Sequence, residues 1–496
     1  MQSISLISGK KYEIPTELND RAGIDDFIAK NAGKKVVVVQ GLGFVGAVMS
    51  FVVSNALTEE YAVIGIDLPS ENSYWKIQSI NEGVLPLSSS DKKVEQFFLA
   101  AKKKGNLYAT FDSYAYSKAD VVVVDINLDV KKEQGEQNEL LDYSVNLSSF
   151  KAAISSIAKN CKEDLLLLVE TTVPPGTCKH VVKPLFEEEF AKRGLTPKYY
   201  IGHSYERVMP GPNYIDSIQN FYRVYSGINE ESANAVELFL KTIIKTDQYP
   251  LTRLHSTTAT EMAKVMENSF RAMNIAFIEE WGQFAEEAEV NLYEVVNAIR
   301  MRPTHKNIML PGLGVGGYCL TKDPLLASWS KQEIFKSKSG LPQSETAVKI
   351  NDRMPLHSFN LIQKHFKNNL AGKKILFLGV SYLSDVGDTR YTPVELLYDN
   401  LMASKAEIAL HDSYVNYWQE KDLVVEKDVA KALNAKFDAI LFSTMHSEYL
   451  SNAIIEKHLL ENPQTVVFDL WGMLNTTELK KKNIINKIIV TGRGDL

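Results

Sequence analysis

The segment from Pro311 to Asp323 carries the residue types best suited to covalent chemistry. Four glycines within six residues precede the thiol of Cys319, and Lys322 and Asp323 follow it. Glycine lets backbone approach a ligand closely, a thiolate is a nucleophile, and an aspartate can handle a proton or a water. The segment predicts either a covalent step at Cys319, helped by the charge of Lys322, or a glycine-rich turn whose cysteine only packs. The segment alone does not decide between the two.

A second glycine turn lies between two predicted strands near the start of the chain. The apolar run 35–40 predicts a buried strand, a helix is expected to end at Ser54, and the run 61–67 predicts a strand that ends in Asp67. This order is typical of a dinucleotide-binding unit, whose glycines let a pyrophosphate reach a helix N-terminus. Asp67 would accept from the ribose hydroxyls and repel a 2′-phosphate, so NAD is favoured over NADP; a turn without a cofactor is the alternative. The turn reads Gly41, Leu42, Gly43, Phe44, Val45, Gly46.

Further strands are predicted over 120–125, 164–169 and 199–201, separated by helical stretches. Continuous apolar runs of this kind are typical of a parallel sheet covered on both faces. The loops after two of these strands, 170–177 and 203–211, are polar, and ligands of such sheets bind beyond the carboxyl ends of the strands. Both loops are therefore candidate walls of a site. For Glu206 and Arg207 a solvated surface pair is the alternative.

The region from Thr257 to Ala288 is predicted to be one long amphipathic helix. Its apolar stripe is expected to face a core or a subunit interface. A second face holds Lys264 and Asn268, a cation and an amide donor suited to an oxyanion, together with Glu261 and Arg271. The alternative is an exposed face on which Glu261 pairs with Lys264. The stripe comprises Met262, Val265, Met266, Phe270, Met273, Phe277, Trp281 and Phe284.

The last third of the chain repeats the strand and helix alternation without the glycine fingerprint. A helix over 345–366 and a linker over 369–373 lead to strands expected near 374–379, 407–411, 438–442, 465–469 and 488–490. The turn after the first of these strands holds Arg390 close to Pro393, which is suited to the start of a helix. An arginine beside a helix N-terminus suits a phosphate, and an ion pair between Asp388 and Arg390 is the alternative.

Composition bounds the functional classes. The 496 residues exceed one hydrophobic core, so two or three domains are expected, and the hydrophobic and charged fractions of 45% and 23% are those of a globular protein. The net charge of −6, without a long basic run, argues against nucleic acid and anionic membranes as partners. No apolar run reaches the length of a membrane span, so a cytoplasmic protein is expected. Cys161 and Cys178 are interpreted as incidental thiols, and no metal site is predicted.

The order of the motifs resembles the UDP-glucose/GDP-mannose dehydrogenase superfamily, which oxidises the C6 alcohol of a nucleotide sugar to a carboxylate. The resemblance runs from about Lys35 to Met473. It implies two Rossmann-like doubly wound α/β domains joined by a central helical dimerisation domain. The ERVMPG loop looks most like the branch that acts on UDP-N-acetylhexosamines. The motifs are the glycine fingerprint, TVPPGT, ERVMPG, EMAKVMENSFRAMNIAFIEE, GVGGYCLTKDP and GDTRYTP.

The resemblance implies roles for individual residues. Cys319 would capture an aldehyde and carry a thioester, Lys264 and Asn268 would stabilise oxyanions, and Asp323 would order the lysine and a water. Glu206 and Thr172 fall at positions that assist with water and the thioester. The expected substrate contacts are Glu206, Arg207, Lys264, Asn268, Gly314 and Gly316. The expected NAD contacts are Gly41, Gly43, Phe44, Val45, Gly46, Asp67, Asp125, Thr171 and Arg390.

The resemblance also implies domains, partners and some gaps. Expected are an extension over 1–34, an NAD-binding domain over 35–250, a central helical domain with the cysteine loop over 251–345, a connecting helix and linker over 346–372, and a UDP-binding domain over 373–496. The central helices would pair two or more subunits. Asp125 to Leu128 departs from the usual Val-x-Thr-Pro segment, and Tyr382 and Leu383 replace a phenylalanine-lysine pair. An arginine expected from a partner near His305 matches Arg302 only loosely.

Other functions stay open from the sequence alone. A UDP-glucose 6-dehydrogenase would share the same chemistry. A two-electron dehydrogenase of the 6-phosphogluconate type would share the first two domains but would need neither Cys319 nor a third domain. A non-catalytic nucleotide-sugar sensor would be expected to have lost at least one of Lys264, Asn268, Cys319 and Asp323, and all four are present.

Overall fold

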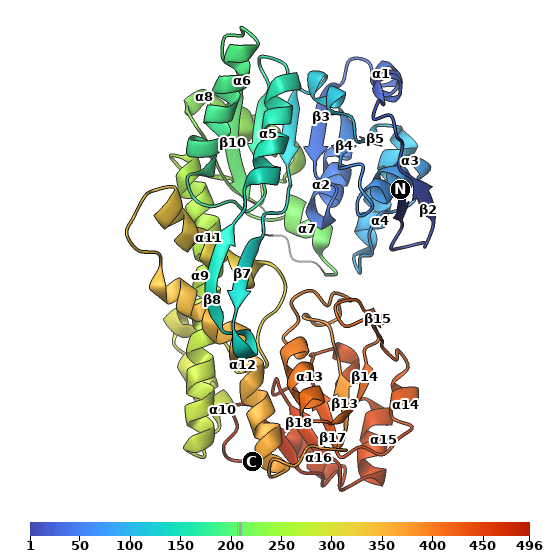
Figure 1. Ribbon diagram of the computed structural model, residues 1–496, viewed down its shortest axis with the longest axis vertical. Helices are drawn as coiled ribbons and strands as arrows, with labels where there is room; N and C mark the ends of the chain where they lie inside the picture. Colours follow the sequence, from blue (N-terminus) through green and yellow to red (C-terminus); the bar gives the residue numbers. More distant parts are fainter. Residues whose placement is uncertain (206, 208–210) are drawn as a thin grey trace. The chain divides into compact units, whose positions relative to one another are not determined.

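The computed structural model describes residues 1–205, 207 and 211–496, which separate into two compact units (Figure 1). The first unit comprises residues 1–130, 145–265 and 329–338, and the second comprises residues 131–144, 266–328 and 339–496. None of the helices in the described ranges has the length and apolar character that a membrane span requires. Each unit is built around its own sheet.

The sheet of the first unit has the strand order β12-β11-β10-β9-β6-β3-β4-β5. The strands from β10 to β5 run parallel, as expected, whereas β11 is antiparallel to β10 and reverses the direction at one edge. The strands are β3 (Lys35–Gln40), β4 (Tyr61–Ile66), β5 (Leu107–Thr110), β6 (Val121–Val124), β9 (Leu166–Val169), β10 (Tyr200–Tyr205), β11 (Val224–Gly227) and β12 (Thr252–Arg253).

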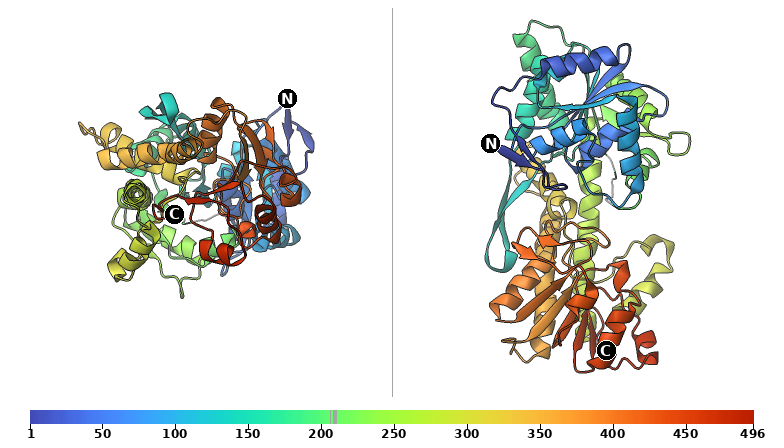
Figure 2. Two further views of the ribbon diagram at one scale, coloured as in Figure 1. Left: turned by 90° about the horizontal axis from the view of Figure 1, so that it is seen from below. Right: turned by 90° about the vertical axis from the view of Figure 1, so that its right-hand side faces the viewer.

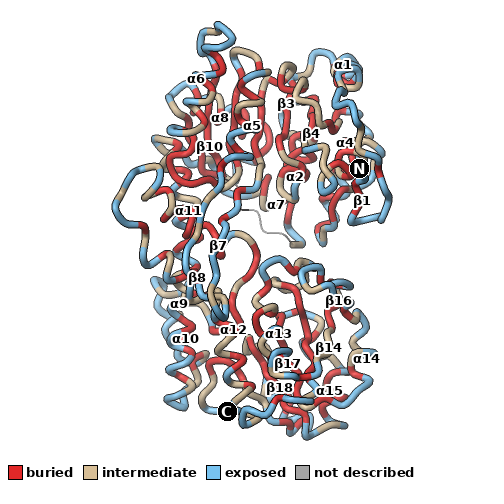
Figure 3. Tube along the Cα trace, in the orientation of Figure 1, coloured by how far each residue is buried: buried red, intermediate tan, exposed pale blue. Residues whose placement is uncertain are grey.

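Helices cover both faces of this sheet because its strands are apolar on both sides. Alternate residues of β3, such as Val37 and Val38, enter separate cores with the helices of opposite faces. Figure 3 shows the central strands as buried. The helices are α1 (Arg21–Lys30), α2 (Phe44–Ser54), α3 (Tyr74–Glu82), α4 (Lys92–Lys104), α5 (Ser148–Asn160), α6 (Lys183–Lys192), α7 (Tyr214–Gln219) and α8 (Glu230–Ile243).

The N-terminal segment, expected only as an extension over 1–34, is a strand hairpin followed by the helix α1. Strands β1 (Gln2–Ile4) and β2 (Lys11–Glu13) pair antiparallel. The hydroxyl of Ser3 accepts the backbone N–H of Trp75 at 3.0 Å, close to the first residue of α3. Lys10 pairs with Glu82 at the other end of that helix. The hairpin therefore holds both ends of α3.

The long helix expected over 257–288 is α9 (Thr257–Glu287), and the helix expected over 345–366 is α12 (Pro342–His365). Between them lie α10 (Leu292–Arg300) and α11 (Cys319–Glu333). A hairpin of β7 (Val130–Gln134) and β8 (Leu140–Val145) was not predicted, because its residues are mostly polar. It contacts α12 through Lys132, which pairs with Asp352 at 2.5 Å.

The second unit holds a parallel five-stranded sheet of order β14-β13-β17-β18-β19, which confirms the second α/β region. Buried clusters lie on both of its faces, and Figure 2 shows helices on both sides. Its strands are β13 (Lys374–Leu378), β14 (Glu407–His411), β17 (Ala439–Phe442), β18 (Val466–Asp469) and β19 (Ile488–Val490). Its helices are α13 (Val394–Ala403), α14 (Val429–Ala432), α15 (Ala453–Glu461) and α16 (Thr476–Lys481), and β15 (Tyr417–Trp418) pairs with β16 (Leu423–Val424).

Candidate active site

The turn between β3 and α2 has the geometry of a pyrophosphate cradle. Gly41 has a φ of +98°, and a Cβ there would lie 2.6 Å from the carbonyl oxygen of Asp125. A Cβ on Gly46 would collide with the carbonyl oxygen of Gly41, whereas one on Gly43 would meet no described atom within 4 Å. Gly43 is the N-cap of α2, and within the described chain no side chain caps this end. The N–H groups there can donate hydrogen bonds to a phosphate, so the turn fits NAD.

Asp67 lies directly after β4, as the fingerprint requires. Its carboxylate accepts the backbone N–H groups of Leu42 at 3.1 Å and Leu68 at 2.7 Å, and Lys76 of α3 approaches it at 3.7 Å. These contacts orient the carboxylate and leave it partly exposed. Lys76 was not predicted. It is the first basic residue after the acid, which is the signal that would have found it.

The ends of β6 and β9 supply two more predicted cofactor residues. Asp125 follows β6, and its Cβ would lie 3.1 Å from a Cβ placed on Gly46, so it backs the glycine turn. Thr171 follows β9 and donates its hydroxyl to the carbonyl oxygen of Ile126 at 2.7 Å. Thr172 comes next in the same loop and is partly buried. The structure therefore brings the glycine turn, Asp125 and Thr171 together at one edge of the sheet.

The loop 170–177 is anchored to α9 by Glu261, which was expected on the same helix face as Lys264. Glu261 is fully buried, and its carboxylate accepts the backbone N–H groups of Gly176 at 2.5 Å and Cys178 at 2.8 Å. The alternative of an exposed Glu261 paired with Lys264 is therefore wrong. Cys178 lies against this buried carboxylate, and its interpretation as an incidental thiol stays a prediction.

Lys264 projects one turn later from α9 and lies against the end of β10. Its Nζ is 5.6 Å from the ring centroid of Tyr205, and the guanidinium of Arg207 is 5.5 Å from the same ring. Burial, together with the charge of Lys264, lowers the pKa of His203 to about 3, so this imidazole is neutral. The cations of Lys264 and Arg207 therefore both lie near the ring of Tyr205. Glu206, the predicted carboxylate of this loop, lies outside the described residues.

The cysteine turn packs against the segment that follows β13. A Cβ on Gly316 would collide with the carbonyl oxygen of Tyr391, and one on Gly317 would lie 2.8 Å from the ring of Tyr382. Gly314 lies against Met354 and Pro393. These glycines are therefore required for packing within the chain. Substrate contact at Gly314 and Gly316 stays a prediction.

Cys319 is the first residue of α11 and is exposed. The N-terminal end of a helix favours negative charge, which suits a thiolate. One turn later, Asp323 is fully buried and accepts the amide N–H of Asn268 at 2.6 Å and the Nζ of Lys322 at 3.2 Å. The amide of Asn268 thus lies against the carboxylate of Asp323, and the expected ordering of Lys264 and a water by Asp323 stays a prediction. The ammonium of Lys322 is directed to Asp323.

Arg390 forms the predicted alternative, an ion pair with Asp388. Its Nε and a terminal nitrogen donate to the two carboxylate oxygens at 2.8 and 2.5 Å, and its guanidinium lies 4.8 Å from the ring centroid of Tyr318. Arg390 therefore supports the residue before the cysteine. Its proposed contact with a cofactor stays a prediction.

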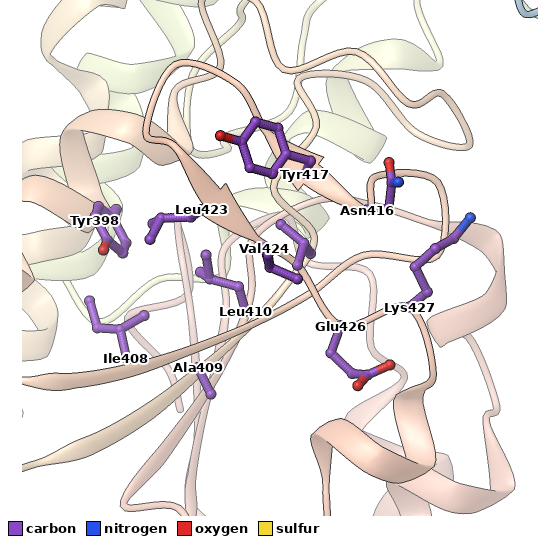
Figure 4. Close-up of a pocket in the computed structure, with 11 residues that line it drawn as sticks. Tyr398, Ile408, Ala409, Leu410, Asn416, Tyr417, Leu423, Val424, Glu426 and Lys427 are labelled. Atoms are coloured by element: carbon purple, nitrogen blue, oxygen red, sulfur yellow. The ribbon is translucent and has the colours of Figure 1, made fainter. Parts of the chain in front are cut away.

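A cavity of about 770 Å³ lies elsewhere in the second unit, beside the edge strand β14 (Figure 4). Tyr398, Leu410, Tyr417 and Val424 are among the residues that line it, with Glu426 and Lys427 at one end. It contains none of the predicted catalytic residues. Within the described ranges no group of three His, Cys, Asp or Glu side chains could hold a metal ion.

Comparison with known proteins identifies the class and then the family. Residues 34–244, 258–353 and 376–476 match, in this order, an NAD-binding domain, a central domain and a UDP-binding domain. The protein is thus an NAD-dependent nucleotide-sugar dehydrogenase by class. The three matched domains all carry one family description, and the chain belongs to the UDP-glucose/GDP-mannose dehydrogenase family. The predicted family, fold and cofactor are confirmed, whereas the roles of single residues stay predictions.

Relatives and solved structures align with nearly the whole chain. The UDP-N-acetyl-D-mannosamine dehydrogenase of Methanocaldococcus jannaschii is 28% identical over 94% of this chain and 99% of its own. The structure of the enzyme described as UDP-D-ManNAc dehydrogenase from Pyrococcus horikoshii has a TM-score of 0.75 at 26% identity, covering 93% of this chain and all of that one. An NDP-N-acetyl-D-galactosaminuronic acid dehydrogenase from Methanosarcina mazei has a TM-score of 0.74 at 26% identity over 95% of this chain and 98% of that one.

Proposed function

We propose that this protein oxidises the C6 alcohol of a UDP-N-acetylhexosamine, of the GlcNAc, ManNAc or GalNAc type, to the uronic acid in a four-electron reaction. The product would serve as a precursor of a surface polysaccharide. The ERVMPG loop supports the N-acetylhexosamine branch. The relatives from Methanocaldococcus and Pyrococcus, both named as UDP-N-acetyl-D-mannosamine dehydrogenases, support it as well.

NAD would be held by the first unit. The N–H groups at the start of α2 would bind the pyrophosphate and Asp67 the ribose, with Thr171 and Asp125 at the neighbouring strand ends. Bound NAD supplies the hydride acceptor for both oxidation steps. The residues over 35–250 would form this domain and those over 373–496 the domain for the uridine diphosphate, with 251–345 and 346–372 between them and 1–34 as an extension.

Cys319 would carry the sugar between the two oxidations. The thiolate adds to the C6 aldehyde and gives a thiohemiacetal, whose loss of a hydride and a proton leaves a thioester. Water then attacks the thioester carbonyl, the carbon–sulfur bond breaks, and the uronic acid leaves with the thiolate restored. Lys264 and Asn268 would stabilise the oxyanions of these steps. Thr172 and Glu206 would assist the attacking water.

One observation carries this assignment most directly, namely the bond of 2.6 Å between the amide of Asn268 and the carboxylate of Asp323. It ties α9 to the first turns of α11, where Cys319 is the exposed first residue. Because Asp323 is fully buried, the pair can hold the amide of Asn268 in one orientation. A thiol that only packs would be expected to be buried, as Cys161 and Cys178 are.

The central helices are proposed to pair two or more subunits. Most of the predicted apolar stripe of α9 is exposed on the chain, and large exposed apolar patches mark interaction surfaces. The exposed members are Met262, Met266, Phe270, Phe277, Trp281 and Phe284. Arg302 is the candidate for the arginine that a partner would donate.

The test counts NADH formed per sugar consumed, with UDP-GlcNAc, UDP-ManNAc, UDP-GalNAc and UDP-glucose as substrates. Two NADH per sugar on an N-acetylhexosamine, and no acid from Cys319→Ser, are expected. Cys161→Ser is the matched control, because Cys161 is buried beside Arg193 and has no proposed role. One NADH per sugar, or acid from Cys319→Ser, would contradict the thioester route. Turnover of UDP-glucose alone would move the assignment to a UDP-glucose 6-dehydrogenase.

A further inference from the structure

A buried carboxylate closes the N-terminal end of a helix next to the loop that carries Thr172. Glu261 of α9 accepts the N–H of Gly176 at 2.5 Å and that of Cys178 at 2.8 Å. Cys178 begins the π-helical segment η3 (Cys178–Val182), which runs on into α6. A helix N-terminus exposes several N–H groups and favours an anion. Here a side chain of the protein itself fills that position.

The buried environment of Glu261 disfavours the charged form of its carboxylate. Burial raises its pKa to about 7, although hydrogen bonds from Cys178, Gly176 and Thr177 act in the opposite direction. Burial, together with the neighbouring Glu261 carboxylate, raises the pKa of the Cys178 thiol. Neutral side chains of similar size would avoid the desolvation but could not accept every one of these N–H groups. The hydrogen bonds from the loop N–H groups offset the unfavourable free energy of burying this carboxylate.

The same loop is attached to a second helix of the candidate site. The hydroxyl of Ser330, in the C-terminal half of α11, donates to the carbonyl oxygen of Pro175 at 2.5 Å. Within the loop, the hydroxyl of Thr177 donates to the carbonyl oxygen of Pro174 at 2.6 Å. The loop is thus joined to α9 by Glu261 and to α11 by Ser330.

The position of Glu261 in α9 makes its contact relevant to chemistry. Lys264 follows three residues later, so both side chains leave the same helical turn. At its other end the loop is fixed to the cofactor side by the bond from Thr171 to the carbonyl oxygen of Ile126. Thr172 lies between these two attachments. A shift of the loop on α9 would therefore move Thr172 relative to Lys264.

We propose that Glu261 is a positioning residue: its carboxylate holds the 170–177 loop on the turn of α9 that carries Lys264, and so sets the placement of Thr172 and Lys264 about the reacting carbon. This inference rests on the proposed function, because it assigns Glu261 to the dehydrogenase reaction. Glu261 touches neither the sugar nor NAD in this scheme and acts through the loop. Its loss is expected to affect turnover more than binding.

The test compares Glu261→Gln with Glu279→Gln, a second buried acid of α9 whose pKa is also raised by burial and which accepts from Gln283 instead of a loop. In Glu261→Gln one carboxylate oxygen becomes an NH₂ group that faces N–H donors, so about a 30-fold fall in kcat is expected. The KM for the UDP-sugar should change by less than about threefold, as for a residue that acts on positioning. Glu279→Gln should keep kcat within about twofold.

A second readout separates failure of this inference from failure of the proposed function. Hydrogen exchange of the Gly176 and Cys178 amides should accelerate by about tenfold in Glu261→Gln and stay unchanged in Glu279→Gln, whatever the substrate is. Normal kcat in a folded Glu261→Gln protein, or equal exchange in both variants, would overturn the inference. If Glu261→Gln does not fold, Ser330→Ala removes the other attachment, and an unchanged kcat there would overturn it equally. Faster exchange in a protein that turns over none of the sugars would leave the anchor established and the proposed function refuted.

Discussion

Each of the two sheets of this protein has a glycine turn directly after one of its strands, but the two turns lead into different structures. Gly41 after β3 and Gly379 after β13 have φ values of +98° and +100°. In each sheet the next strand along the chain is followed directly by an acid, Asp67 after β4 and Asp412 after β14. In the first sheet α2 begins three residues after the glycine. In the second sheet a long segment intervenes before α13 and packs on the cysteine turn.

The two acids differ in how accessible their carboxylate oxygens are to a ligand. Asp67 accepts two backbone N–H groups and remains partly exposed. Asp412 is fully buried, and its oxygens accept the N–H groups of Val380, Ser381, Tyr414 and Val415 and approach Nε2 of His446 at 3.1 Å. A ribose could not displace so many donors without a large loss. The acid after the second strand therefore marks a dinucleotide site only when the surrounding turn leaves it accessible.

The largest difference should appear in stability. Asp412→Asn leaves an amide among backbone donors and His446, and should lower the free energy of unfolding of the second unit by about 3 kcal/mol. Asp67→Asn should cost less than about 1 kcal/mol and instead weaken NAD binding by roughly tenfold. Chemical denaturation and titration with NAD measure the two quantities. Equal losses of stability would show that the two acids have the same structural role.

Low pH should remove the stability that Asp412 contributes to the second unit. Burial would raise the pKa of Asp412, but the hydrogen bond and charge of His446 and the backbone N–H groups outweigh it and lower the pKa below its usual value. A lowered carboxyl pKa stabilises the fold above the unfolded value near 4, and this contribution is lost as the pH falls below it. The second unit of the wild type should lose stability in this range more steeply than that of Asp412→Asn. Urea denaturation between pH 5 and pH 3 is the measurement, and parallel curves would contradict it.

The two turn glycines provide the next comparison. A Cβ at Gly41 would meet the carbonyl oxygen of Asp125, and one at Gly379 would meet Thr444. Alanine at either position should cost roughly 2 kcal/mol, because neither φ suits an L-residue. Only Gly41→Ala should also weaken NAD binding, since of the two turns only that one leads within three residues into a helix N-terminus. Weaker NAD binding in Gly379→Ala would argue against the difference drawn here.

The sequence could predict the features that depend on residues close together in the chain, but not those that depend on contacts between distant residues. The glycine turn, Asp67 and the helix with Lys264 and Asn268 depend on spacing along the chain, which periodicity and motifs capture. The reversal at β11 and the polar hairpin β7–β8 carry no apolar run that would separate them from loops. Spacing put Glu261 on one face with Lys264, but it could not show that Gly176, some 85 residues away, covers that carboxylate.

Lys76 offers the smallest and most specific change. It reaches Asp67 from α3 at 3.7 Å, and its helix is held in place by Ser3 and Lys10 of the N-terminal hairpin. Lys76→Ala should raise the Kd for NAD by about threefold with no change in binding of UDP, because a partly exposed ion pair contributes less than about 1 kcal/mol. Lys76→Arg should restore most of the affinity. Isothermal titration with NAD and with UDP measures both; an equal loss for UDP would mean that Lys76 supports the fold in general, and not the carboxylate that distinguishes the first turn from the second.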